Sequence, residues 1–174
     1  MTFSLDYSLE ILSQTPATLQ SLLGGLSDEW TKNNEGPDTW SPYEVLGHLI
    51  HGEKTDWVPR ARIILSNAPD KTFVPFDRFA QANEDQNKSI TDLLAEFSSL
   101  RAENIQAIKA MQLTEEKLNQ KGTHPALGPA TLRELLSTWT VHDLGHIAQI
   151  SRVMAKQYRT EVGPWSAYLG ILKQ

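Results

Sequence analysis

The chain has 174 residues, of which 40% are hydrophobic, and this is enough for one domain with a substantial core. It contains no cysteine, which excludes disulfides, thiolate metal ligands and a sulfur nucleophile supplied by the protein. The net charge of -5, without runs of Lys or Arg, argues against a nucleic-acid partner. No apolar stretch approaches the roughly 20 residues of a membrane span, and the start shows no secretory signal. We therefore expect a single cytoplasmic domain over residues 1–174, with no membrane partner.

The first half of the sequence predicts two long helices. Leucines at helical spacing predict a helix over 5–24, bent or restarted at Pro16 and ended by a pair of glycines. A polar loop follows, and then Ser41, Pro42 and Glu44 form a capping box with proline at the first helical position. The helix that begins there should cover 41–66, with a kink at Pro59 because proline lacks a backbone N–H.

The second half predicts two more helices, separated from the first pair by a long connection. Residues 67–88 contain prolines, phenylalanines and mixed charge without a period, which is typical of a lid or a crossover. Further capping boxes predict helices over 89–112 and 131–158, with a short turn near residue 114 and a loop over 121–130. The last residues should add one short helical segment. The sequence thus predicts an all-α four-helix bundle with at most a short strand pair.

The most informative stretch is VHDLGHIAQI, which contains His142 and His146. Residues four apart project from one face of a helix, about one turn from each other, so the two imidazoles could share one metal ion. The other members of the same stripe are mostly apolar, which predicts that it faces the core; they are Leu135, Trp139, Gln149 and Val153. Two core histidines bonded to hydroxyls or carbonyls are the alternative, because HxxxH alone is a weak signal.

A third histidine strengthens the metal interpretation. In VLGHLIHGE on the second helix, His48 shares a face with Val45, and His51 lies about one turn further along. Three imidazoles bind divalent ions such as Zn, Ni, Fe or Mn and leave positions open for water or substrate. His51 could instead be the ligand, support a ligand, or be solvated. The sequence assigns no role to His124.

These segments together resemble a known family. WSPYEVLGHLIHGEKTDW, FVPFDRFAQ and HPALGPATLRELLSTWTVHDLGHIAQI are similar to the DinB-like, or YfiT-like, superfamily of bacterial metal-binding four-helix bundles. The resemblance implies an up-down-down-up bundle whose crossover joins the second and third helices. It also implies that His48, His142 and His146 are the metal ligands. Members of this family include thiol S-transferases and a thiol-dependent isomerase, and many others are described only as metal-dependent hydrolases.

We expect an enzyme that uses the ion to activate a small-molecule thiol, which would attack an electrophilic small-molecule substrate. The thiol must come from a co-substrate because the chain has no cysteine. A hydrolase that uses metal-activated water is the first alternative, and a non-catalytic metal-binding or structural bundle is the second. The aromatic candidates to cover the substrate are Phe73, Phe76 and Phe79, and the candidates to hold a carboxylate are Arg60, Arg62 and Arg78.

Two other metalloenzyme motifs fit less well. HDLGH differs from the HExxH of zinc proteases by Asp143 in place of the glutamate base, and Asp143 points about 100° away from His142. An HD-type phosphohydrolase would need further His and Asp ligands at spacings that the sequence does not contain. Neither motif therefore changes the expectation of a three-histidine site.

Three residues are candidates to support the ligands, and two to form an interface. A ligating imidazole normally donates its second N–H to an acceptor, and Glu44, Thr138 and Gln149 lie within one turn of His48, His142 and His146 respectively. The remaining candidates lie near the C-terminus: Trp165 and Tyr168, if exposed, would be contacts for a homodimer.

Overall fold

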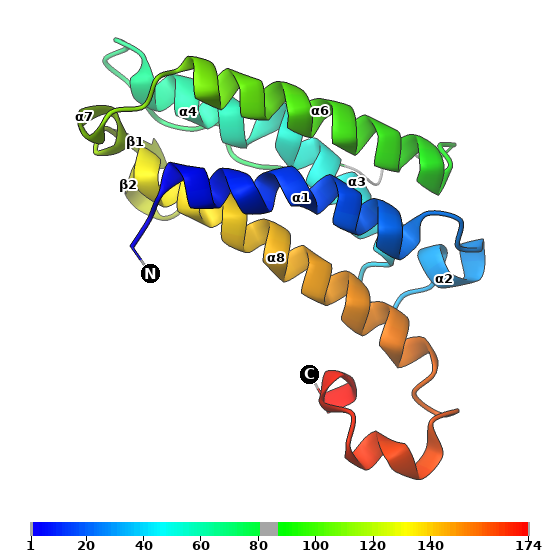
Figure 1. The fold of residues 1–174 in the computed structure, drawn as a ribbon. Coiled ribbons are helices and arrows are strands. Elements are labelled where there is room, and N and C mark those ends of the chain that lie inside the picture. The colour runs from blue at the N-terminus through cyan, green and yellow to red at the C-terminus, as the bar shows by residue number, and fades with distance from the viewer. Residues whose placement is uncertain (1, 81–86, 174) are drawn as a thin grey trace.

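The computed structural model describes residues 2–80 and 87–173, and almost all of its regular structure is helical (Figure 1). The long helices are α1 (Leu5–Leu23), α3 (Pro42–Thr55) with its continuation α4 (Trp57–Leu65), α6 (Ile90–Ala110) and α8 (Leu132–Gln157). The short elements are α2 (Asp28–Lys32), α7 (Glu115–Leu118), strands β1 (Lys121–His124) and β2 (Gly128–Thr131), and the 3-10 helices η1 (Gly163–Ala167) and η2 (Gly170–Lys173). This confirms an all-α fold with one strand pair.

The bundle has the up-down-down-up order. α1 and α8 run in one direction, and α3–α4 and α6 run in the other (Figure 1). α1 packs on α6 and α8, and α3 packs on the same two helices, so the four form a closed ring around the core. The consecutive helices α3–α4 and α6 run in the same direction, so the chain must return along the length of the bundle between Leu65 and Ile90.

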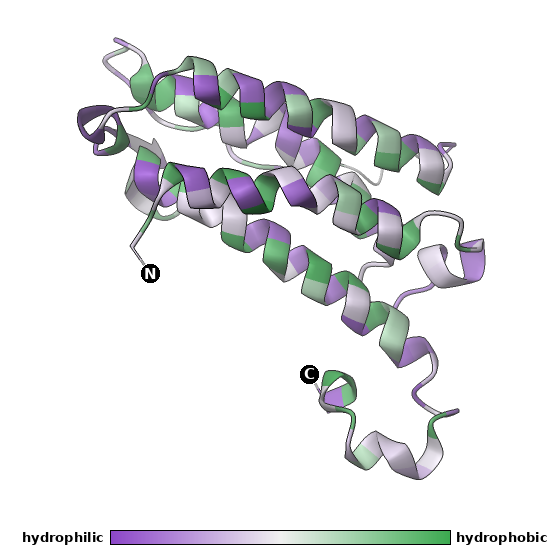
Figure 2. Cartoon of the chain, in the orientation of Figure 1, coloured by the Kyte–Doolittle hydropathy of each residue, from purple (hydrophilic) through white to green (hydrophobic). Residues whose placement is uncertain are grey.

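The helices begin where the sequence predicts them. Ser41, Ser89 and Thr131 each accept a hydrogen bond from the backbone N–H three residues later, and the acidic side chain at that position bonds back to the cap. Such reciprocal caps satisfy N–H groups that a helix start would otherwise leave without partners. Every long helix carries both hydrophobic and hydrophilic residues along its length (Figure 2), and the hydrophobic ones meet inside the ring.

The second long helix is broken rather than gently kinked. The break is at Asp56, where φ is -108° and ψ is -71°, and Pro59 is the third residue of the new helix α4. The first-turn N–H groups of a helix have no intrahelical partner, so proline costs least there. The predicted interruption of the helix is present, but it is a break at Asp56, three residues before Pro59, rather than a kink at the proline.

Pro16 does not interrupt α1, which corrects the prediction of a restart. The helix is continuous from Leu5 to Leu23. Proline at position 16 removes the N–H that would bond the carbonyl of Leu12. That carbonyl instead accepts a hydrogen bond of 2.9 Å from the guanidinium of Arg101 on α6. A partner from another helix therefore satisfies the carbonyl that the proline exposes.

The predicted loop over 121–130 is an antiparallel hairpin, β1–β2, which was missed because its strands contain Gly and Pro. The crossover is tied to this hairpin: the N–H of Phe73 bonds the carbonyl of Thr123, and the N–H of Thr123 bonds the carbonyl of Lys71, both at 2.9 Å. The short α2 was also not predicted. Among the described helices, none has the length and hydropathy needed to cross a bilayer.

The C-terminal segment forms two short 3-10 turns rather than one helical segment, and it bends away from the end of α8 (Figure 1). Leu172 is buried, but Trp165 and Tyr168 are 69% and 89% exposed. Their exposure leaves them available for an interface, and the homodimer stays a prediction.

Candidate metal centre

Three imidazoles from two helices meet at one point. His48 projects from α3, and His142 and His146 project from α8. The Nε2 atom of His142 lies 3.2 Å from Nε2 of His48 and 3.1 Å from Nε2 of His146. Each ring offers a nitrogen, and these atoms all lie within 4.8 Å of one another. The structure therefore brings together the three residues that the sequence selected.

The spacing of these nitrogens fits a shared cation. Nitrogen ligands at about 2.0–2.1 Å from a tetrahedral ion are about 3.3 Å apart, close to the two distances observed. Hydrogen bonds alone account for the cluster poorly. Gln149 accepts from Nδ1 of His146 at 2.8 Å, so Nε2 of His146 has a lone pair. If Nε2 of His142 donates its proton to that lone pair, it has neither a second proton nor a lone pair for Nε2 of His48. The two contacts therefore cannot both be hydrogen bonds.

Burial keeps the histidines neutral, which is the form that binds metal. Burial, and after it the positive charges of neighbouring groups, His146 foremost, lower the pKa of His48 and of His142 to about 3. A contact of His48 with the backbone of Arg78, too loose to be a hydrogen bond, acts weakly in the opposite direction. Burial also lowers the pKa of His146, against the opposing effects of its bond to Gln149 and of Asp143.

One of the three predicted supporting residues contacts its histidine. Gln149 bonds His146 and fixes the ring so that Nε2 faces the cluster. The carboxylate of Glu44 accepts instead from the backbone N–H and the hydroxyl of Ser41, as part of the capping box, and does not bond His48. The hydroxyl of Thr138 donates to the carbonyl of Glu134 in its own helix, and it does not accept from His142 as predicted, because Nδ1 of His142 has no hydrogen-bond partner among the described residues.

The Nδ1 atoms of His48 and His142 are buried and have no hydrogen-bond partner among the described residues. An imidazole that coordinates through Nε2 carries its proton on Nδ1. Both rings are instead held by aromatic contacts: Trp40 packs on His48 with ring centroids 4.8 Å apart, and Trp57 packs edge-on against His142 at 5.1 Å. Packing therefore holds the rings of His48 and His142, as the bond to Gln149 holds that of His146.

His51 lies outside the cluster. Its ring packs against Phe76 with centroids 5.0 Å apart and is buried. It lies on α3 between His48 and the break at Asp56. His51 is therefore placed to support the wall of the site rather than to join the three converging nitrogens.

A cavity of about 420 Å³ opens beside the cluster, and all three histidines line it. This volume is in the range that holds a small-molecule ligand. Phe73 and Phe76 from the crossover form part of its wall, as do Arg60, Arg78 and His124. Two candidates from the sequence are misplaced: Phe79 is 61% exposed and contacts Trp40 from outside, and Arg62 is exposed on α4, away from the cavity.

Asp143, next to His142 in the sequence, belongs to a buried ion network that the sequence did not reveal. Its carboxylate accepts from two nitrogens of Arg101 at 2.6 and 3.0 Å. Arg101 also donates to Glu53 at 2.8 Å, and Glu53 accepts from Trp139 and Asn104. Arg101 and Asp143 are at most 1% exposed. The network explains why Asp143 is not available as the base of a protease.

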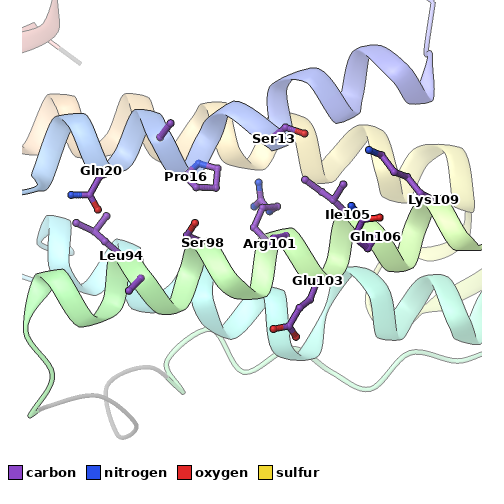
Figure 3. Close-up of a pocket in the computed structure, with 13 residues that line it drawn as sticks. Ser13, Pro16, Gln20, Leu94, Ser98, Arg101, Glu103, Ile105, Gln106 and Lys109 are labelled. Atoms are coloured by element: carbon purple, nitrogen blue, oxygen red, sulfur yellow. The ribbon is translucent and has the colours of Figure 1, made fainter.

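A larger hollow lies elsewhere, in a groove of about 1010 Å³ between α1 and α6 (Figure 3). Small side chains such as Ser13 and Ser98 leave the space open, and Arg101 lies at its inner side. Because Arg101 is already bonded to Asp143 and Glu53, the groove offers no free reactive group at that point. The histidine cavity is the better candidate for chemistry.

Comparison with known proteins agrees with this architecture. The model of the DinB superfamily matches residues 11–150, which include all three histidines. Among solved structures, the chain is similar to YfiT from Bacillus subtilis, described as "a probable metal-dependent hydrolase with an unusual four-helix bundle topology". The TM-score is 0.72 at 19% identity, and the match covers 93% of this chain and 91% of YfiT. No curated protein matches the chain.

Proposed function

The chain belongs to the DinB superfamily, and on that premise we propose that it is a metal-dependent hydrolase whose single divalent ion is bound by His48, His142 and His146. The observation that carries the proposal is the convergence of three neutral Nε2 atoms on the wall of a ligand-sized cavity. A purely structural bundle would have no need for such a cavity beside its buried histidines. The description of YfiT supports the same reaction class.

An ion held by three neutral imidazoles keeps its full positive charge and, when bound, acidifies water and polarises a carbonyl or similar group. The residues of the chain position it. His142 and His146 are held one turn apart on a rigid helix, and Gln149 orients His146 through Nδ1. Trp40 and Phe76 pack on the rim formed by His48 and limit the access of bulk water.

The carboxylates of the cavity have other tasks than proton abstraction. Glu134 accepts from the N–H and hydroxyl of Thr131 at the start of α8, and Asp56 is paired with Arg60. Asp143 is buried with Arg101. A glutamate base of the HExxH type thus has no counterpart among the described residues of the site, and the metal centre itself must supply most of the activation.

Transfer of a thiol is the second candidate. The three-histidine set would activate a thiol as it activates water, and the absence of cysteine from the chain means that a co-substrate must bring the sulfur. The two functions are separated by measuring turnover of an activated ester with and without small-molecule thiols. Turnover that requires a thiol, and that incorporates it into the product, would favour transfer over hydrolysis.

The metal site is tested first by elemental analysis. We expect purified protein to contain about one divalent ion per chain, His48→Ala and His142→Ala to lose it, and His51→Ala to keep it, since His51 lies outside the converging set. His51→Ala is the matched control because it removes the same side chain from the same helix. Full metal content in His48→Ala, or its loss in His51→Ala, would contradict the assignment.

A further inference from the structure

Arg60 is a buried arginine with unused donors. It is 7% exposed, its guanidinium lies over the ring of Phe73 at 5.2 Å, and it lines the histidine cavity. Its Nε pairs with Asp56, one turn earlier, at the start of α4. No described residue hydrogen-bonds its two terminal nitrogens, although a guanidinium carries five N–H donors.

His124 adds a donor to the same cavity. Its Nδ1 accepts from the backbone N–H groups of Ala126 and Leu127, both at 3.1 Å. The proton of the neutral ring must therefore be on Nε2. Burial, and after it the charge of Arg60, lowers the pKa of His124, which keeps the ring neutral and reflects the nearness of the guanidinium.

These donors share a cavity with the metal-site histidines but come from other elements. Arg60 is on α4 and His124 is on β1, whereas the three ligands are on α3 and α8. Phe73 contacts both donors: its ring lies under Arg60 and packs edge-on against His124 at 6.5 Å. An apolar surface with N–H groups directed past it suits a planar, two-oxygen anion attached to a carbon chain.

We infer that Arg60 and His124 form a carboxylate-binding subsite, so that the substrate is a small molecule with a carboxylate at one end and the bond to be cleaved at the other. Arg60 binds the carboxylate through its terminal nitrogens, and His124 donates from Nε2. Asp56 holds the guanidinium in place by its Nε edge and leaves the other edge to the ligand. Because the inference concerns the cleavage of that substrate at the metal, it rests on the proposed function.

The test uses two matched sets of metal-binding probes on the zinc-loaded protein. One set consists of simple alkyl hydroxamates of increasing length, and the other consists of the same chains ending in a carboxylate. Isothermal titration calorimetry measures the dissociation constant of each. We expect the carboxylate probes to bind about tenfold tighter or more at the length that spans the cavity, which corresponds to one charge-assisted hydrogen bond.

Variants then assign the gain to named residues. Arg60→Gln should remove the advantage of the carboxylate, and Arg62→Gln, an exposed arginine two positions later on α4, should leave it intact. His124→Asn keeps an acceptor for the turn but removes the Nε2 donor, so it should lose part of the gain. Should Arg60→Gln fail to fold, Arg60→Lys keeps the positive charge beside Asp56 but lacks the two terminal nitrogens of the guanidinium. It should therefore reduce the extra affinity of the carboxylate probes.

The outcomes separate the inference from the proposed function. If both sets bind equally at every length, the subsite is refuted and the metal site stands. If the gain persists in Arg60→Gln, the assignment to Arg60 is refuted. If no hydroxamate binds the zinc-loaded protein, the proposed metal centre fails and the subsite falls with it.

Discussion

Removing the guanidinium of Arg101 should destabilise the metal-free protein more than any surface substitution. Arg101→Met keeps most of the buried volume but leaves the carboxylates of Glu53 and Asp143 without their shared cation. It also leaves the carbonyl of Leu12 without its donor. The loss of one partner from a buried ion pair costs about 3–5 kcal/mol, because the remaining charge is neither solvated nor paired.

That cost is large relative to the whole stability of a domain, which is about 5–15 kcal/mol. The assay is urea unfolding followed by circular dichroism, with metal removed so that its binding energy does not contribute. Arg133→Met is the matched control, because Arg133 forms an ion pair with Glu115, which is 80% exposed. Exposed pairs contribute about 0–1 kcal/mol. Equal losses in Arg101→Met and Arg133→Met would refute the view that the buried network stabilises the fold.

Three further predictions concern the site and the C-terminus. The pKa of His142 falls to about 3 in the folded chain from an ordinary 6.5, so metal-free stability should be complete above about 6.5 and decrease as the pH falls toward 3, and His142→Gln should show a shallower decrease in urea midpoint. Gln149→Ala should weaken zinc binding about 10- to 100-fold in competition with a chelating dye, whereas Thr138→Val should not, because its hydroxyl serves its own helix. If Trp165 and Tyr168 contact a second chain, replacing both with serine should yield monomers in analytical ultracentrifugation, and an unchanged mass would exclude that interface.

The fold was predictable because its signals are local. Each long helix after the first starts at a capping box, a pattern that spans only four residues, and the HxxxH pair on α8 is fixed by the pitch of one helix. The third histidine of the cluster was harder to predict. Periodicity alone did not distinguish His48 from His51, and the resemblance to a family indicated His48, which the structure places beside His142.

The predictions that failed involved either a side chain with two possible partners or contacts between residues far apart in the sequence. The sequence predicted two interactions for the carboxylate of Glu44, one with Ser41 in the capping box and one with His48. In the structure the carboxylate bonds Ser41 and does not contact His48. The network of Arg101, Glu53 and Asp143 joins positions 42 and 48 residues apart, and no sequence period relates them. A local hint was the presence of three charged residues, Glu53, Arg101 and Asp143, on core-facing sides of amphipathic helices.

The bond between Arg101 and the carbonyl of Leu12 also determines the register of α1 on α6. Pro16 makes that carbonyl the one acceptor in the middle of α1 that its own helix leaves open. If α1 slid by a turn, Arg101 would face a carbonyl that already accepts a bond within α1. The carbonyl of Leu12 would then lie in the apolar interior without a donor. The proline thus gives α1 a specific polar contact with α6, whereas the other buried residues of the two helices are mostly apolar.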